Sequence, residues 1–259
     1  MANIDKHPVG SFCWIELGTS DQNAAKSFYT SLFGWSFNEF PMGPQDVYTI
    51  FRLQDRDVAA AYTLRPQERA QGVPPHWNLY VAVENADQTA AKAADLGGTV
   101  LSPAFDVMDV GRMAIVQDPT GAMILPWQAK KQTGTGLTGV DGTLCWADLS
   151  TPDPDRAQTF YGGLFGWTFE KGKNDDYIHI KNGSEYIGGI PPAQHRNPNA
   201  PPHWLSYFYV SDVEATAAKA KQLGATLHLP PMKMENVGTM AVVADPQGAA
   251  FALFASARK

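Results

Sequence analysis

The sequence has no run of basic residues and no apolar segment long enough to span a bilayer. Binding to phosphates or anionic membranes needs clustered Lys and Arg, whereas the net charge here is −6. The first ten residues, MANIDKHPVG, lack the apolar core of a signal peptide. We therefore expect a cytoplasmic protein that binds neither nucleic acid nor membrane.

Cysteine is also scarce, with Cys13 and Cys145 as the two examples in 259 residues. They occupy equivalent positions of a repeat, FCW and LCW, so we expect them in separate cores and not in a disulfide. No CxxC motif or Cys/His cluster is present to hold zinc. We interpret both as small buried apolar residues.

Aromatic motifs, by contrast, are abundant and occur twice. FYTSLFGW at 28–35 recurs as FYGGLFGW at 160–167, PPHW at 74–77 recurs at 201–204, and DPTGA at 118–122 recurs as DPQGA at 245–249. Such long-range repetition predicts two tandem domains, 8–129 and 142–257, with the Gly- and Thr-rich segment 130–141 as a linker.

Each half repeats a weaker internal pattern of one strand, one helix and several strands. Ala25, Phe28, Tyr29 and Leu32 follow helical spacing, so we place the FYxxLFGW residues in a helix–sheet core. Asn182-Gly183 is typical of a tight hairpin turn. The fold class is therefore α+β, with four βαβββ modules near 10–65, 75–128, 142–190 and 202–256.

This element order, with the PHW strand entries and the DPxGA turns, resembles the vicinal oxygen chelate superfamily of glyoxalases, bleomycin-resistance proteins and extradiol dioxygenases. The motifs look most like those of two-domain glyoxalase-like proteins, a group that includes a secreted mycobacterial antigen and hydroxylase-type proteins of anthracycline biosynthesis. The resemblance covers nearly the whole chain and implies curved sheets that enclose a cavity. It does not imply one activity, because this scaffold hosts unrelated chemistries.

In catalytic relatives, His, Glu or Gln side chains on the first and last strands of each module hold a divalent metal. Counting from the motifs places three of these positions at Trp14, Asn78 and Leu125 in the first domain, and at Trp146, Leu205 and Ala252 in the second. The fourth falls within VAAAYT and YIGGI, which contain no His, Asp or Glu. Trp, Leu and Ala cannot ligate a metal and a lone Asn is a weak ligand, so we expect no metal and no other cofactor.

Alternation along the first strand of each domain predicts the residues of the concave face. Phe12, Trp14 and Glu16 should point to that face, and Cys13, Ile15 and Leu17 to the helix. In the second domain Leu144, Trp146 and Asp148 follow the same pattern. A Trp beside a carboxylate could hold an aromatic, cationic or hydroxyl-bearing ligand, or the Trp could fill the cavity.

Other candidates lie on neighbouring strands. His76 and His203 follow Pro-Pro turns, which favours a role in the turn over catalysis, and Arg112 has Thr239 as its counterpart, which favours a solvated rim charge. The candidate ligand-binding residues are Trp14, Glu16, Asn78, Tyr80, Trp127, Trp146, Asp148, His203 and Tyr207.

Three functions remain open. The first is metal-free binding of a small, aromatic or hydroxyl- or carbonyl-bearing molecule. The second is catalysis of a glyoxalase-like or hydroxylase type with Glu16 or Asp148 as general base. The third is a structural or interaction module with filled cavities. We favour binding, by a monomer or a homodimer, and leave catalysis undecided.

Overall fold

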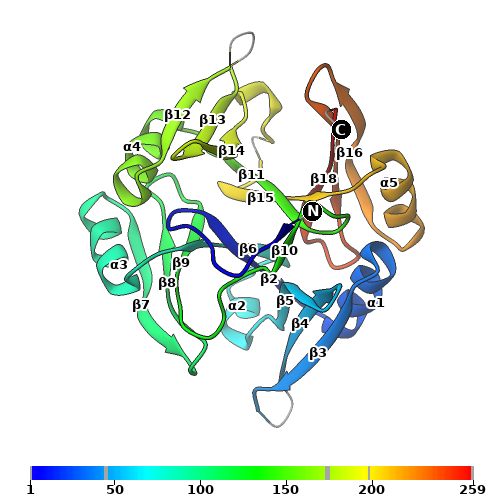
Figure 1. The fold of residues 1–259 in the computed structure, drawn as a ribbon, viewed down its shortest axis with the longest axis horizontal. Helices are drawn as coiled ribbons and strands as arrows, with labels where there is room; N and C mark the ends of the chain where they lie inside the picture. The colour runs from blue at the N-terminus through cyan, green and yellow to red at the C-terminus, as the bar shows by residue number, and fades with distance from the viewer. Residues whose placement is uncertain (1, 44–45, 173–175, 198, 258–259) are drawn as a thin grey trace.

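The computed structural model describes residues 2–43, 46–172, 176–197 and 199–257. These residues form two eight-stranded sheets, one in each half of the chain, with helices at the periphery (Figure 1). The strand orders are β3-β4-β5-β2-β6-β9-β8-β7 and β12-β13-β14-β11-β15-β18-β17-β16. Identical orders in the two halves show that the sequence repeat is a repeat of one fold.

The first half contains two modules. The first module is β2 (Phe12–Thr19), α1 (Gln22–Phe33), β3 (Ser36–Pro41), β4 (Val47–Leu53) and β5 (Arg56–Thr63), followed by the short α2 (Pro66–Ala70). The second is β6 (His76–Ala82), α3 (Ala86–Asp95), β7 (Thr99–Val107), β8 (Gly111–Gln117) and β9 (Met123–Ala129). The linker contributes β10 (Leu137–Thr138), which pairs with β1 (Ala2–Asn3).

The second half repeats this order. Its first module is β11 (Leu144–Ser150), α4 (Pro154–Phe165), β12 (Thr168–Lys171), β13 (Ile178–Asn182) and β14 (Glu185–Ile190), followed by the 3-10 turn η1 (Ala193–His195). The second is β15 (His203–Tyr209), α5 (Val213–Gln222), β16 (Thr226–Met234), β17 (Gly238–Ala244) and β18 (Ala250–Ser256). The prediction of four βαβββ modules is confirmed.

Local chemistry fixes where the main helices begin and end. Asp21 and Asp153 cap α1 and α4, each side chain accepting a hydrogen bond from the backbone N–H three residues later. Gly34 and Gly166 end these helices in the left-handed conformation, at φ of 72° and 75°. No helix within the described ranges is long and apolar enough to cross a membrane.

The modules pair within each half. The central strands β2 and β6 are antiparallel and place Glu16 opposite Asn78, and β11 and β15 place Asp148 opposite Leu205. β5 and β9 join these central strands in parallel, so each sheet is mixed. The strands at the two ends of each order do not pair with each other, so the sheets are curved but not closed.

The aromatic residues of the two FYxxLFGW motifs are buried as predicted, apart from the partly buried Phe165, and they also join the two domains. The Tyr29 hydroxyl on α1 donates to Asp245 Oδ2 of the second domain at 3.0 Å, and it accepts from Trp77 Nε1 at 3.2 Å. The equivalent Tyr161 on α4 donates to Asp118 Oδ2 of the first domain at 2.9 Å. Each aromatic motif thus contacts the DPxGA turn of the other domain.

Aromatic packing surrounds these hydrogen bonds. Phe33 packs against Phe208, and Phe12 packs edge-on against Trp167 and Trp204, with ring centroids 5.1 to 5.4 Å apart. In Figure 1, α1 lies beside α5 and α3 beside α4, so helices of different domains are neighbours. The helix-bearing faces of the two sheets therefore meet in one shared core, and the concave faces point outward.

We expect Tyr29→Phe and Tyr161→Phe each to lower the free energy of unfolding by about 1–3 kcal/mol, because each leaves a buried carboxylate oxygen and a buried indole N–H without a partner. Urea unfolding followed by tryptophan fluorescence measures this change. Tyr186→Phe is the matched control, since its hydroxyl bonds Glu170 at the surface and its loss should change stability far less. Separate unfolding transitions for the two domains would contradict the shared core.

Candidate functional site

The concave face of the first domain carries a packed apolar cluster around Trp14. Its buried members are Cys13, Trp14, Ala60, Tyr80, Met113, Leu125 and Trp127. Trp14 is 5% exposed and Trp127 6% exposed. Trp14 therefore points to the concave face as predicted, and the candidate residues Tyr80 and Trp127 lie in the same cluster, but these rings present little surface to solvent.

Alternation gave the wrong face for the residues at the start of the first strand. Phe12 lies in the core between the domains and Cys13 in the concave cluster, opposite to the prediction. The reason is a register shift between Phe12 and Trp14 against β6, where an extra residue interrupts the period-two pattern. The predicted direction of Leu144 is wrong for the same reason, since β11 shifts register between Leu144 and Trp146. Leu144 packs against the shared core and not on the concave face.

The two cysteines are free thiols. Cys13 is fully buried and Cys145 partly exposed. Burial raises the pKa of both thiols, that of Cys145 to about 12. Neither is set up as a nucleophile, because the reactive form is the thiolate.

Each domain has a carboxylate that accepts hydrogen bonds from two tyrosines. In the first domain Glu16 accepts from Tyr48 and Tyr80, both at 2.8 Å. Although Glu16 is partly exposed, the loss of hydration around its carboxyl group raises its pKa more than these hydrogen bonds lower it.

In the second domain Asp148 is buried and accepts three hydrogen bonds. The donors are Tyr177, Tyr207 at 2.7 Å and the indole N–H of Trp146 at 3.0 Å. Burial raises the pKa of Asp148, and the three donors oppose that shift without cancelling it. The carboxylate thus fixes the orientation of three aromatic side chains.

Sequence reasoning missed Tyr48 and Tyr177. They occupy equivalent positions, since Ile50 pairs with Ala60 opposite Glu16, and His179 pairs with Gly189 opposite Asp148. The signal was present in both halves as a tyrosine followed directly by a β-branched residue, in VYTI and in YIHI, although the intervening loops differ in length.

The two concave faces differ in how they are covered. In the first domain the linker crosses the cluster, where Thr135 N–H donates to Cys13 O at 2.7 Å and Trp127 Nε1 donates to Gln132 O at 3.0 Å. The ring of His7 also contacts the linker, with Nε2 lying 2.9 Å from Thr135 O. In the second domain Trp146 remains partly exposed.

The histidines after the Pro-Pro turns have a role in those turns. His76 Nδ1 lies 2.8 Å from Pro74 O, and His203 Nδ1 lies 2.8 Å from Pro201 O, so in each ring this nitrogen is the donor. Both rings are partly exposed. His76 also lies near Glu16, whose pKa its positive form lowers.

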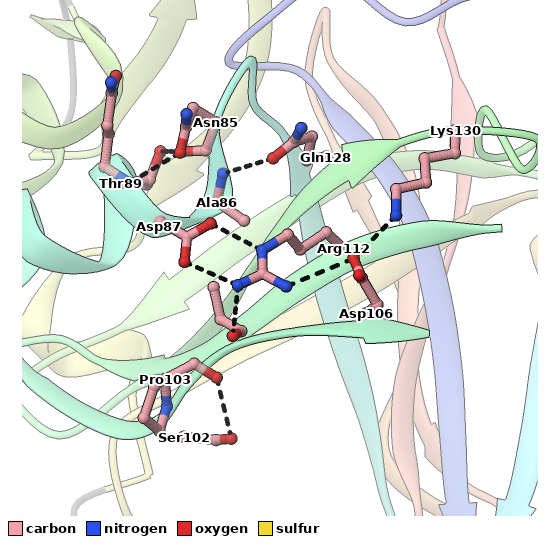
Figure 2. Close-up of polar contacts among 12 residues, drawn as sticks. Asn85, Ala86, Asp87, Thr89, Ser102, Pro103, Asp106, Arg112, Gln128 and Lys130 are labelled. Carbon is pink, nitrogen blue, oxygen red and sulfur yellow. Dashed lines mark hydrogen bonds and ion pairs between the residues drawn. The ribbon is translucent and has the colours of Figure 1, made fainter. Parts of the chain in front are cut away.

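Arg112 is tied into a structural network (Figure 2). Its guanidinium donates to both carboxylate oxygens of Asp87 at 2.7 and 2.8 Å and to Ala104 O at 2.9 Å. Asp106 lies on its other side at 3.4 Å and also pairs with Lys130. Arg112 therefore links α3 to β7 and β8, and its donors are already used.

Comparison with known proteins agrees with this geometry. The family model of the Glyoxalase/Bleomycin resistance protein/Dioxygenase superfamily matches residues 11–125 and 143–253. The chain belongs to this superfamily. It is 42% identical to CFP32 of Mycobacterium tuberculosis, a glyoxylase candidate by its name, over 98% of this chain and 97% of CFP32. It is 30% identical to the anthracycline biosynthesis protein DnrV of Streptomyces peucetius, over 94% and 92%.

Solved structures share the superfamily fold at low sequence identity. The 2,3-dioxygenase LapB from Pseudomonas sp. KL28 has a TM-score of 0.66 at 16% identity, covering 95% of this chain and 92% of LapB. The Mn(II)-bound glyoxalase from Novosphingobium aromaticivorans has a TM-score of 0.66 at 15% identity, covering 95% and 82%.

The side chains at the superfamily metal positions do not fit a divalent metal. In the first domain Trp14 and Leu125 are part of the apolar cluster, beside Ala60 of β5. In the second domain Gly189 takes the place of Ala60, and a Cβ atom there would lie 2.0 Å from the Tyr177 hydroxyl, so no ligating side chain has room. Among the described residues, no group of three or more His, Cys, Asp and Glu comes together.

The raised pKa of Asp148 predicts a pH-dependent stability. The unfolded chain releases the Asp148 proton near its ordinary pKa of about 3.9, whereas the folded state keeps that proton to a higher pH. The retained proton stabilises the folded state. This contribution to stability is therefore complete below a pH of about 3.9 and is lost as the pH rises through the folded pKa. Asp148→Asn cannot titrate. We expect the unfolding free energy of the wild type, relative to this variant, to fall with rising pH in urea titrations. The wild type should lose stability with rising pH relative to Glu16→Gln as well, because the pKa of Glu16 is also raised. A stability of the wild type, relative to either variant, that increases with pH would contradict the raised pKa of that carboxyl group.

Proposed function

We propose that the protein binds a small molecule on the concave face of its second domain without a metal ion, with a ring of the ligand stacked on Trp146. The observation that carries the proposal is the partly exposed indole of Trp146 held by Asp148. An aromatic ring fixed by a hydrogen bond at its edge loses little freedom when a ligand stacks on it. Tyr207 and Tyr177 supply hydroxyl groups beside it.

The first domain supports this function less well. Its Trp14 and Trp127 are almost fully buried beneath the linker, so a ligand would have to displace protein contacts before it could stack on either ring. The second domain has Ala252 where the first has Leu125, and Ala250 where the first has Met123. Smaller side chains on the equivalent strand leave more room beside Trp146.

The ligand class follows from the groups at the site and from the relatives. An aromatic wall with tyrosine hydroxyls and a carboxylate suits a planar molecule that carries hydroxyl or carbonyl groups. The name of DnrV refers to anthracyclines, which are polycyclic aromatic ketones of this description. The name of CFP32 refers to a glyoxylase, so small carbonyl adducts are the second class of ligand to test.

Catalysis at Glu16 is the second candidate function. Glu16 is a partly exposed residue, and the loss of hydration around its carboxyl group raises its pKa, which makes it a stronger base than an ordinary glutamate. His76 and Asn78 lie beside it. Asp148 is less suited to be a base, because its oxygens already accept three hydrogen bonds.

Ligand titrations distinguish these possibilities. We expect a hydroxylated anthraquinone to quench tryptophan fluorescence, and Trp146→Ala to weaken binding about tenfold or more, the size of a contact worth roughly 2 kcal/mol. Trp146→Phe should retain most of the affinity, and Glu16→Gln should leave it unchanged. Loss of binding in Glu16→Gln with full binding in Trp146→Ala would move the site to the first domain.

Metal analysis tests the proposal that the ligand is bound without a metal ion. We expect protein dialysed against Mn²⁺, Ni²⁺ or Zn²⁺ to retain less than one equivalent per domain, because Trp, Leu and Ala offer no ligand atoms. A chelator should leave the melting temperature unchanged. One tightly held equivalent that disappears in Asn78→Ala would overturn this expectation.

A further inference from the structure

A pocket of about 250 Å³ lies on the helix-bearing side of the second domain, away from Trp146. Its walls come from the first residue of α4, Pro154, from Ile178 on β13, and from the segment after β14 that includes Pro192 and Arg196. Ile178 and its strand neighbours on this face pack against the shared core, whereas Tyr177 points to the concave face. The pocket is therefore separate from the site proposed above.

The same place in the first domain is filled by a glutamine. Gln22 is the first residue of α1, as Pro154 is of α4, and its buried amide donates to Val47 O and Thr63 Oγ1, both at 2.9 Å. Thr49 Oγ1 donates back to the Gln22 amide oxygen at 2.8 Å. One side chain thus closes the gap between the helix, β4 and β5.

The second domain has lost every side chain of that network. Thr49 pairs with Ala61 on β5, and Ile178 pairs with the equivalent Ile190 on β14, so Ile178 replaces Thr49. Two residues beyond those partners, Pro192 replaces Thr63. Pro154, Ile178 and Pro192 are shorter or apolar and cannot make the glutamine contacts, so the gap remains open as the pocket.

Arg196 adds a positive charge and hydrogen-bond donors to the pocket wall. Its Nε and Nη1 atoms are buried, and they have no hydrogen-bond partner in the part of the chain that the structure describes. A guanidinium is always charged, and leaving its donors buried and unpaired is unfavourable. Among the described residues of the pocket wall, Asp176 is the one acidic side chain, and it pairs with Lys171 at 2.7 Å.

We propose that this pocket is a second binding site, for a small carboxylate with an apolar body. The carboxylate would accept from Arg196, and the body would contact Pro154, Ile178 and Pro192, where the first domain has its own Gln22 side chain. A carboxylate is favoured over an inorganic anion because most of the wall is apolar and could not hydrate sulfate or phosphate. The small volume favours a short-chain or single-ring acid.

Ligand-observed NMR with benzoate, at constant ionic strength, tests the proposal on the full chain. We expect benzoate to bind, and benzamide and sulfate to bind at least about tenfold more weakly, because each lacks either the charge or the apolar body. Arg196→Gln should weaken benzoate binding by a similar factor. Arg156→Gln is the matched control, since that arginine is exposed on α4 and should have no effect.

A second variant fills the pocket by copying the first domain. The triple variant Pro154→Gln, Ile178→Thr and Pro192→Thr should abolish benzoate binding and keep the circular dichroism spectrum and the melting temperature of a folded protein. Trp146→Ala should leave benzoate binding unchanged, which separates this site from the one proposed for aromatic ligands. Absence of benzoate binding in the wild type, equal binding of benzamide, or full binding in Arg196→Gln would each overturn the proposal.

Discussion

The hydrogen bonds that cross between the domains are the constraint on which the rest of the structure depends. Tyr29 of the first domain bonds Asp245 of the second, and Tyr161 of the second bonds Asp118 of the first. Each aspartate also accepts backbone N–H groups of its own turn, so one carboxylate both shapes a DPxGA turn and anchors the other domain. Because these groups are buried, separating the domains would expose a large aromatic surface and leave several polar atoms unpaired. We therefore expect the two halves to unfold as one unit.

These contacts between the domains restrict the side chains on the helix-bearing face of each sheet and leave those on the concave face free to differ. The helix-bearing faces must remain alike, because Trp35 donates to Gly142 O and Trp167 donates to Gly10 O in the same reciprocal way. The concave faces point away from the shared core and carry no such requirement. They have diverged accordingly, with an apolar cluster beneath the linker in the first domain and a partly exposed Trp146 in the second. A repeated scaffold can thus keep one interface twice and present two different surfaces.

Local sequence signals were sufficient to predict the helices, strands and turns. The features that the sequence did not predict depend on contacts between residues far apart in the chain. Gly34 and the Asn182-Gly183 turn were readable because the backbone at each point demands a particular residue. The face on which Phe12 lies could not be predicted, since the register shift adds one residue to the strand and no local sequence feature indicates it. Tyr48 was missed because its contact with Glu16 runs through β5, a pairing set by the whole sheet. Helical periodicity likewise cannot tell a core within one domain from a core shared by two.

The pocket beside Arg196 shows how such a scaffold gains a site while its shared core is preserved. Removing one member of a buried hydrogen-bonded set leaves the others unpaired, whereas replacing all members with apolar groups is close to neutral for stability. The second domain shows the latter change, with proline and isoleucine where the first has Gln22, Thr49 and Thr63. A simple packing defect would have an apolar lining. Two buried guanidinium nitrogens of Arg196 distinguish this pocket from such a defect, because they have no partner among the described residues and favour an added acceptor.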